Sequence, residues 1–251
     1  MTAREPSFKD HFSGHAASYA AFRPRYPDAL FDFLARSAPA REHAWDCGTG
    51  NGQTAVSLAA HFERVTATDA SAAQIAAAEP HPRVAYRVAA AEASGIDEET
   101  VDLVTVAQAL HWFDIERFFA EALRVLAPGG VLAVWCYGLC RVERRIDAVI
   151  EGLYRAVDAW WPPERRLIEE GYRSITLPLP ALPAPAFAMS ADWSADAMLG
   201  YLRTWSACQR HLAERGTDPV RTVEDELCAL WGAGSRTVRW PLALKAGRRP
   251  A

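Results

Sequence analysis

The sequence predicts an α/β fold in which helices cover both faces of a doubly wound, mainly parallel β-sheet. Short apolar and β-branched runs alternate with segments of helical spacing, which is typical of βαβ units. The first strand run ends in an acidic residue followed by three alternating glycines, as a strand does when it stops at a ligand. The last such run alternates polar and apolar residues, which indicates an antiparallel closing strand. Half of the 251 residues are apolar, so the chain can bury one large core.

Five strands are expected before residue 137, because each run is short, apolar or β-branched and separated from the next by a helical segment. They cover residues 44–46, 65–69, 84–88, 101–106 and 131–137. The helices of this part are expected over residues 28–38, 54–61, 71–79 and 115–126. Ser71 is a favourable N-cap for the third helix, and Pro39 and Pro128 follow the ends of the first and the last.

The pattern changes after residue 137. Residues 141–161 have helical spacing and end at two prolines, and the prolines in 177–185 exclude a central strand. We interpret this region as an insertion over the cleft at the strand ends. Residues 194–214 predict one long helix, and residues 236–244 alternate as the closing strand. These runs account for six strands of a sheet that we expect to have about seven.

The most informative segment is 46–52, which reads Asp-Cys-Gly-Thr-Gly-Asn-Gly. Glycine allows positive φ and carries no Cβ, so the backbone can approach a bound nucleotide closely and a helix can begin at once. The three glycines could also serve only a tight turn from strand to helix. We favour a loop that holds an adenosine-containing cofactor.

The spacing of the glycines in this loop distinguishes between possible cofactors. A dinucleotide site would show G-x-G-x-x-G, whereas position 53 is Gln, and no Gly-Lys-Ser/Thr follows to bind a triphosphate. Asp46 stands where a carboxylate could meet an ammonium group of the cofactor. The pattern therefore favours S-adenosylmethionine.

Asp69 ends the second strand run and is the candidate for binding the ribose. A carboxylate at this position can accept hydrogen bonds from both ribose hydroxyls. The alternative is a structural role for Asp69 beside Ser71 at the start of the next helix.

Further segments follow in an order that resembles the class I S-adenosylmethionine-dependent methyltransferases along most of the chain. Ala90-Ala91-Glu92 is similar to their adenine-contacting turn, residues 101–113 to their fourth strand and following loop, and residues 124–130 to the turn before their fifth strand. Residues 8–27 resemble the opening segment of a small-molecule subgroup that includes the trans-aconitate methyltransferases.

The resemblance implies a Rossmann-like fold with a helical cap, in a single methyltransferase domain over residues 1–251. We expect N-terminal lid helices in 1–40, a cofactor-binding core in 41–137, a cap insertion with helices in 138–235, and the closing strand and tail in 236–251.

The resemblance also implies two groups of site residues. The cofactor side is expected to comprise Tyr19, Arg23, Asp46, Gly48, Thr49, Gly50, Gly52, Asp69, Ala70, Ala91, Glu92 and Gln108. The substrate side is expected to comprise Arg25, His111, Trp112, Tyr201, Arg203 and Trp205. No metal ligand is expected, and the product formed from the cofactor would be S-adenosylhomocysteine.

Several of these residues have a structural alternative. Tyr19 could pack against the first helix, Glu92 could be a solvated turn residue, and Trp112 could belong to the core. Gln108 could hydrogen-bond a loop, and the two arginines of the opening segment could lie on the surface. Ala91 could contribute its backbone alone.

The implied reaction is an in-line displacement in which an acceptor atom attacks the methyl group of a sulfonium. The protein mainly has to align the reactants and exclude water, and aromatic faces such as Tyr19, Trp112 and Trp205 favour the sulfonium charge. The acceptor is expected to be a small molecule, and we favour a carboxylate oxygen of an organic acid as the accepting atom.

A carboxylate is already ionised at neutral pH, so it needs no general base. It needs cations for its other negative groups, and the candidates are Arg23, Arg25 and Arg203. His111 is the candidate catalytic residue, as a base or as an orienting group, although a histidine beside an aromatic residue is more often packed.

Composition narrows the class of protein further. A net charge of −4 gives no general attraction for nucleic acid or acidic membranes. The five cysteines contain no C-x-x-C pair and no set of zinc ligands, so reduced thiols are expected. The N-terminus has no apolar signal core and no apolar run reaches membrane-spanning length, so we expect a cytoplasmic protein. Oligomeric state is not indicated.

Three other functions stay open. The acceptor could be another small-molecule oxygen, nitrogen, sulfur or carbon atom. A protein that binds S-adenosylmethionine without catalysis would carry the same cofactor motifs. A nucleic-acid methyltransferase acting on exocyclic amines would be expected to show Asp/Asn-Pro-Pro-aromatic after the fourth strand, and residues 107–112 depart from that pattern.

Overall fold

The computed structural model describes residues 24–251, so the predicted site residues Tyr19 and Arg23 lie outside the described residues. A seven-stranded sheet has the order β3-β2-β1-β4-β5-β7-β6. Neighbouring strands from β3 to β5 run parallel, and β7 is antiparallel to both β5 and β6. The predicted sheet of about seven strands with an antiparallel closing strand is confirmed.

The first part of the described chain alternates helices and strands, as the sequence predicted. Its elements are α2 (Asp28–Ser37), β1 (His43–Cys47), α3 (Gln53–Leu58), β2 (Arg64–Asp69), α4 (Ala72–Ala76), β3 (Val84–Val88), β4 (Val101–Ala107), η1 (Leu110–Trp112), α5 (Ile115–Val125) and β5 (Leu126–Tyr137). The hydroxyl oxygen of Ser71 accepts a hydrogen bond from the backbone nitrogen of Gln74, so the predicted N-cap of α4 is confirmed.

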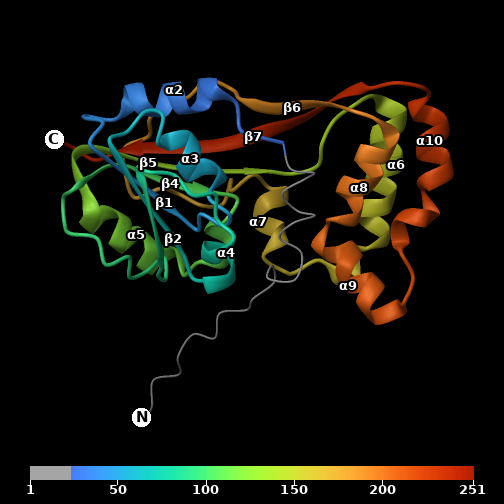
Figure 1. The fold of residues 1–251 in the computed structure, drawn as a ribbon, viewed down its shortest axis with the longest axis horizontal. Helices are drawn as coiled ribbons and strands as arrows, with labels where there is room; N and C mark the ends of the chain where they lie inside the picture. The colour runs from blue at the N-terminus through green and yellow to red at the C-terminus, as the bar shows by residue number, and fades with distance from the viewer. Residues whose placement is uncertain (1–23) are drawn as a thin grey trace, which may run out of the picture.

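The second part forms most of the cap and completes the sheet. Its elements are α6 (Arg144–Ala156), η2 (Asp158–Trp160), α7 (Arg165–Glu169), β6 (Ala188–Trp193), α8 (Ala195–Arg203), α9 (Ser206–Arg215), η3 (Pro219–Thr222), α10 (Glu224–Trp231) and β7 (Arg236–Arg248). Helices α6, α8, α9 and α10 form a group beside the sheet, and α7 lies between this group and the strands (Figure 1).

The prediction of one long helix over residues 194–214 is wrong, because the helix is interrupted between α8, which ends at Arg203, and α9, which begins at Ser206. Trp205 adopts an extended backbone, with φ −63° and ψ 132°, and its side chain is buried. The hydroxyl of Thr204 donates to the carbonyl of Tyr201, and the side-chain amide of Gln209 donates to the carbonyl of Arg203. These bonds satisfy carbonyls at the end of α8, so the helix can stop there.

Two further differences concern strands. β5 begins at Leu126, five positions before the expected start, so the Pro-Gly-Gly sequence lies within it, at an irregularity in its pairing with β4. β6 was not predicted, and its pairing with the first half of β7 places it at the edge of the sheet. The segment 177–185 contains no strand, in agreement with its prolines; Ala181 forms an isolated bridge with Gly247.

Three buried apolar clusters hold these layers together. One contains Trp45 and α5, and a second contains Trp135, α2 and α3; each packs against the sheet. The third lies among the cap helices and contains the fully buried Trp240. Within the described residues, no helix has the length and apolar character needed to cross a membrane.

Candidate active site at the carboxyl ends of the strands

The predicted acids and Gln108 meet at one edge of the sheet. β2, β1 and β4 are neighbours, and Asp46, Asp69 and Gln108 lie at or next to the carboxyl ends of these three parallel strands. The strand order also reverses here, because the chain continues from β1 to β2 on one side and β4 pairs with β1 on the other. Ligands of doubly wound sheets bind at such a switch point.

The glycine loop has the backbone that its sequence predicts. Gly48, Gly50 and Gly52 have φ values of 69°, 55° and 87°, which residues other than glycine rarely adopt. A Cβ on Gly48 would lie 2.6 Å from the Cβ of Ala109, and a Cβ on Gly52 would overlap the hydroxyl of Tyr86. Among residues 24–251, a Cβ on Gly50 would meet only Gln74 Oε1, at 3.8 Å. Gly48 and Gly52 are therefore required by packing, whereas the space beside Gly50 is open.

Asp69 fixes this loop to the start of α4. One carboxylate oxygen accepts from the backbone nitrogen of Gly50 at 2.9 Å, and the other accepts from that of Ser71 at 2.8 Å. The structural alternative beside Ser71 is thus realised. It does not exclude the ribose, because a carboxylate has about four acceptor positions.

Asp46 is buried below the loop, with 1% of its surface exposed. Its two oxygens accept hydrogen bonds from the hydroxyls of Thr49, at 2.5 Å, and Thr105, at 2.8 Å. Burial raises the pKa of Asp46 to about 7; the two hydrogen bonds oppose this shift, and the charge of Asp69 adds to it. A cation placed next to Asp46 would favour its ionised form. Thr105 was not predicted from the sequence. Its role depends on the pairing of β1 with β4, which places Thr105 opposite Asp46.

The predicted adenine-contacting turn lies after β3, and its Ala91 is buried. Ala70, predicted on the cofactor side, follows β2 and is exposed. The carboxylate of Glu92 accepts a hydrogen bond from the backbone nitrogen of Asp114 at 2.9 Å, so Glu92 ties its turn to the loop before α5. This bond fixes the position of the turn and leaves the second carboxylate oxygen of Glu92 to other partners.

Gln108 has a structural role in the described protein. Its side-chain amide donates to the carbonyl of Tyr137 and accepts from the backbone nitrogen of the same residue, at 3.1 and 2.9 Å. Its φ of 56° is left-handed. Gln108 thus bonds the last residue of β5 and not a loop, and these two bonds leave one N–H and one oxygen lone pair of the amide unused.

His111 lies in η1 with 6% of its surface exposed. Its Nδ1 is 3.0 Å from the hydroxyl of Tyr172, and its ring lies against Trp112, which is half-buried. Burial, with a smaller contribution from the charge of Arg165, lowers the pKa of His111 to about 3. The ring is therefore neutral at physiological pH and is poorly matched to the role of general base.

Tyr172 was missed by sequence reasoning. It is fully buried and has a left-handed backbone, with φ 56°. Its neighbour Gly171 also has positive φ, and this turn after α7 places the phenol against His111. The Gly-Tyr pair was the only signal, and it matches no motif. Backbone strain of this kind is often found at functional sites.

Most of the predicted substrate residues of the cap are buried in it or bonded to other residues of it. Tyr201 is buried and accepts a hydrogen bond from the indole nitrogen of Trp240. Trp205 is buried among aromatic rings. Arg203 forms ion pairs with Asp218 and Glu224, at 2.7 and 3.0 Å, so the structure does not favour it as the cation that binds an acceptor. Arg25, before α2, is exposed.

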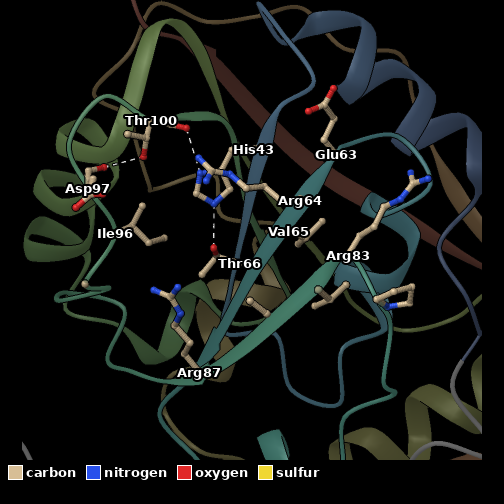
Figure 2. A pocket seen from close by; sticks show the side chains of 14 residues that line it. His43, Glu63, Arg64, Val65, Thr66, Arg83, Arg87, Ile96, Asp97 and Thr100 are labelled. Atoms are coloured by element: carbon tan, nitrogen blue, oxygen red, sulfur yellow. Dashed lines mark hydrogen bonds between the residues drawn. The ribbon is translucent and has the colours of Figure 1, made fainter.

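A separate hollow of about 370 Å³ lies at the amino ends of β1, β2 and β3 (Figure 2). Arg64, Arg83 and Arg87 line it together with Glu63 and Asp97, so charges of both signs are present. It lies at the opposite ends of the strands from the glycine loop. We do not assign the site to it.

Comparison with known proteins gives consistent results. Residues 45–134 match the model of a methyltransferase domain family. A protein of Dictyostelium discoideum, described as a candidate methyltransferase, is 33% identical over 235 residues, which cover 90% of this chain and 89% of that protein. A solved structure from Anaeromyxobacter dehalogenans, described as a candidate type II methyltransferase, is 48% identical with a TM-score of 0.87 and covers 92% of this chain and 100% of that one.

Proposed function

Because this chain belongs to the class I S-adenosylmethionine-dependent methyltransferases, we propose that it transfers the methyl group to a small molecule, at a carboxylate oxygen of an organic acid. We also propose that residues 41–137 form the cofactor-binding core and 138–235 the cap of a single domain. The membership of the trans-aconitate subgroup belongs to the same proposal, and rests on the resemblance of residues 8–27.

The observation that carries the proposal is the space beside Gly50, whose backbone nitrogen donates to Asp69 and whose neighbour Thr49 donates to Asp46. Gly48 and Gly52 are packed against side chains, whereas a Cβ on Gly50 would have a single neighbour within 4 Å among the described residues. Such a space fits a ligand that contacts the backbone. The buried Asp46, with its raised pKa, suits a ligand that brings positive charge.

The two acids at this edge of the sheet then hold the two ends of the cofactor. Asp69 would accept hydrogen bonds from the ribose hydroxyls while it keeps Gly50 and Ser71 in place. Asp46, oriented by Thr49 and Thr105, would face the ammonium group. When bound, S-adenosylmethionine supplies an electrophilic methyl group on a sulfonium.

The acceptor would lie beyond the ends of β4 and β5, beside His111 and Tyr172. Both side chains are buried, and the imidazole is neutral. A site whose histidine is a poor base favours an acceptor that needs no deprotonation, and a carboxylate is such an acceptor at neutral pH. The residues here would orient the acid and exclude water, which aligns oxygen, methyl and sulfur. An amine, thiol or carbon acceptor would need a base that these two residues do not provide.

A methyl-transfer assay tests this function. The protein is incubated with S-adenosylmethionine carrying a tritiated methyl group and with a panel of di- and tricarboxylic acids, each paired with its neutral amide. Base treatment then releases methanol from methyl esters and from few other methylated products. We expect base-labile label with at least one acid and none with the amides.

Two results would redirect the proposal. Label that resists base, or that goes to other small molecules, would assign a different acceptor atom. Binding of S-adenosylmethionine without transfer to any acceptor in a broad panel would indicate a protein that binds the cofactor without catalysis.

A further inference from the structure

Arg165 lies at the start of α7, the short helix between the sheet and the group of helices α6, α8, α9 and α10 (Figure 1). Its guanidinium carbon is 4.7 Å from the ring centre of Trp161 and 5.6 Å from that of Tyr154, both of which belong to the cap. Its Nε donates a hydrogen bond to the hydroxyl of Tyr154 at 3.0 Å. The cation is thus half-buried and held in a fixed orientation by two aromatic side chains.

No carboxylate among residues 24–251 forms an ion pair with Arg165. Two other arginines of residues 138–235 differ: Arg203 pairs with two acids, and Arg141 pairs with Glu151 at 2.6 Å. Glu169 is linked to Arg165 only through the hydroxyl of Tyr154, which donates to it. A guanidinium has five N–H donors, so most of the donors of Arg165 lack a partner in this part of the chain.

Trp161 adds a second donor without an acceptor. Its indole nitrogen is buried and has no hydrogen-bond partner among the described residues. Leaving a buried donor unsatisfied is unfavourable, and native structures contain few such groups. An anion bound next to Arg165 could accept from both side chains.

This cation belongs to the proposed acceptor site. α7 contacts η1, which carries His111. The charge of Arg165 contributes to the lowered pKa of His111 and opposes the rise in pKa that burial causes at Cys136 and Tyr172. His111 follows the end of β4, Cys136 lies at the end of β5, and Tyr172 reaches this place through its hydrogen bond to His111. The guanidinium is therefore close to the place where the acceptor would lie.

We propose that Arg165, with the indole N–H of Trp161, binds a carboxylate of the acceptor that is not methylated. This inference rests on the proposed function. A carboxylate paired with a guanidinium is a weaker nucleophile, so the oxygen that accepts the methyl group belongs to another acid group. The acceptor therefore carries at least two carboxylates.

Calorimetric titration tests this proposal. The protein is first saturated with S-adenosylhomocysteine, and succinate, glutarate and tricarballylate are then titrated in, with tricarballylamide as the neutral control. We expect at least one acid to bind and the amide not to bind. Arg165→Met should weaken that binding roughly tenfold to a hundredfold, the effect of losing hydrogen bonds to a charged group. Trp161→Phe, which keeps the packing but removes the donor, should weaken it severalfold.

Arg166→Met is the matched control, because Arg166 is exposed and follows Arg165 on the same helix. It should leave the binding of the acid unchanged. The affinity for S-adenosylhomocysteine should be the same in all variants and reports that each is folded. Arg165→Gln replaces Arg165→Met if the methionine variant does not fold.

Equal binding of the acid by the wild type and the neutral Arg165 variant would overturn the proposal. Binding of S-adenosylhomocysteine without any of the three acids would also overturn it, and would leave methyl transfer to another acceptor standing. Failure of S-adenosylhomocysteine to bind the wild type would instead remove the proposed function.

Discussion

The side-chain amide of Gln108 bonds to both backbone groups of Tyr137, so the end of β4 is joined to the end of β5 by a side chain. The amide donates to the carbonyl at 3.1 Å and accepts from the nitrogen at 2.9 Å. The left-handed backbone of Gln108, with φ 56°, turns the chain directly into the segment that carries His111. The fixed position of this segment follows from that pair of bonds.

Gln108→Ala is expected to destabilise the protein by about 1–3 kcal/mol, because two hydrogen bonds are lost at a half-buried position. Gln108→Gly loses the same bonds but relieves the left-handed backbone, so it should be more stable than the alanine variant by about 1 kcal/mol. Urea denaturation of the three proteins measures both differences. Equal stability of the wild type and the alanine variant would show that the amide contributes nothing.

Substitutions in the glycine loop can distinguish a loss of stability caused by strain from a loss of contact between the backbone and the cofactor. Gly52→Ala introduces a Cβ that overlaps the hydroxyl of Tyr86, so it should lower the free energy of unfolding by about 2–3 kcal/mol or more. Gly50→Ala meets no close atom and should cost only about 1 kcal/mol of backbone strain. Its affinity for S-adenosylmethionine should nevertheless fall at least tenfold, as measured by calorimetry. Unchanged affinity in a folded Gly50→Ala protein would place the cofactor elsewhere.

His111 should remain neutral far below the usual pKa of histidine. The pKa of His111 in the folded protein is about 3, below the ordinary histidine value of 6.5, so the unfolded chain takes up the proton first as the pH falls. As the pH falls from about 6.5 to 3, His111 therefore lowers the free energy of unfolding. Above pH 6.5 it does not change the stability. NMR of the ring nitrogens, assigned with His111→Asn, should show no titration of His111 near pH 6. A midpoint between pH 6 and 7 would restore it as a candidate base.

Asp46 should release a proton when the cofactor binds near neutral pH. Its pKa is raised to about 7, so part of the population is protonated, and a neighbouring ammonium group would favour the carboxylate. Binding enthalpies of S-adenosylhomocysteine, measured at pH 7 in buffers of different ionisation enthalpy, should show net proton release. The release attributable to Asp46 should vanish at pH 9 and in Asp46→Asn. The same proton count in the wild type and Asp46→Asn at pH 7 would contradict this account.

The βαβ core could be predicted from the sequence because its signals are local. The strand preceding Asp46 and the Ser71 cap depend on residues next to one another in the chain. The cap could not be predicted as well, because its breaks depend on tertiary contacts. Residues 194–214 keep helical spacing throughout, and the break at Trp205 is stabilised by packing and by bonds from Thr204 and Gln209.

In the candidate site, too, some features could be predicted from the sequence and others depend on tertiary contacts. The backbone conformations of the three glycines follow from residue type, and the meeting of Asp46 and Asp69 follows from the order of parallel strands. The partners of individual side chains do not follow, since Arg203 is paired by Asp218 and Glu224, which lie in another part of the cap. For the same reason Tyr172 and Arg165 were not predicted, because only the fold brings them to His111.

The most direct test of the central claim is calorimetric titration of the wild-type protein, freed of copurified ligand, with S-adenosylmethionine, S-adenosylhomocysteine and NADH. The open backbone at Gly50 and the two acids beside it predict saturable binding of both sulfur cofactors and no binding of NADH. Binding of NADH alone, or of none of the three by a protein that is shown to be folded, would contradict the assignment of this loop to S-adenosylmethionine.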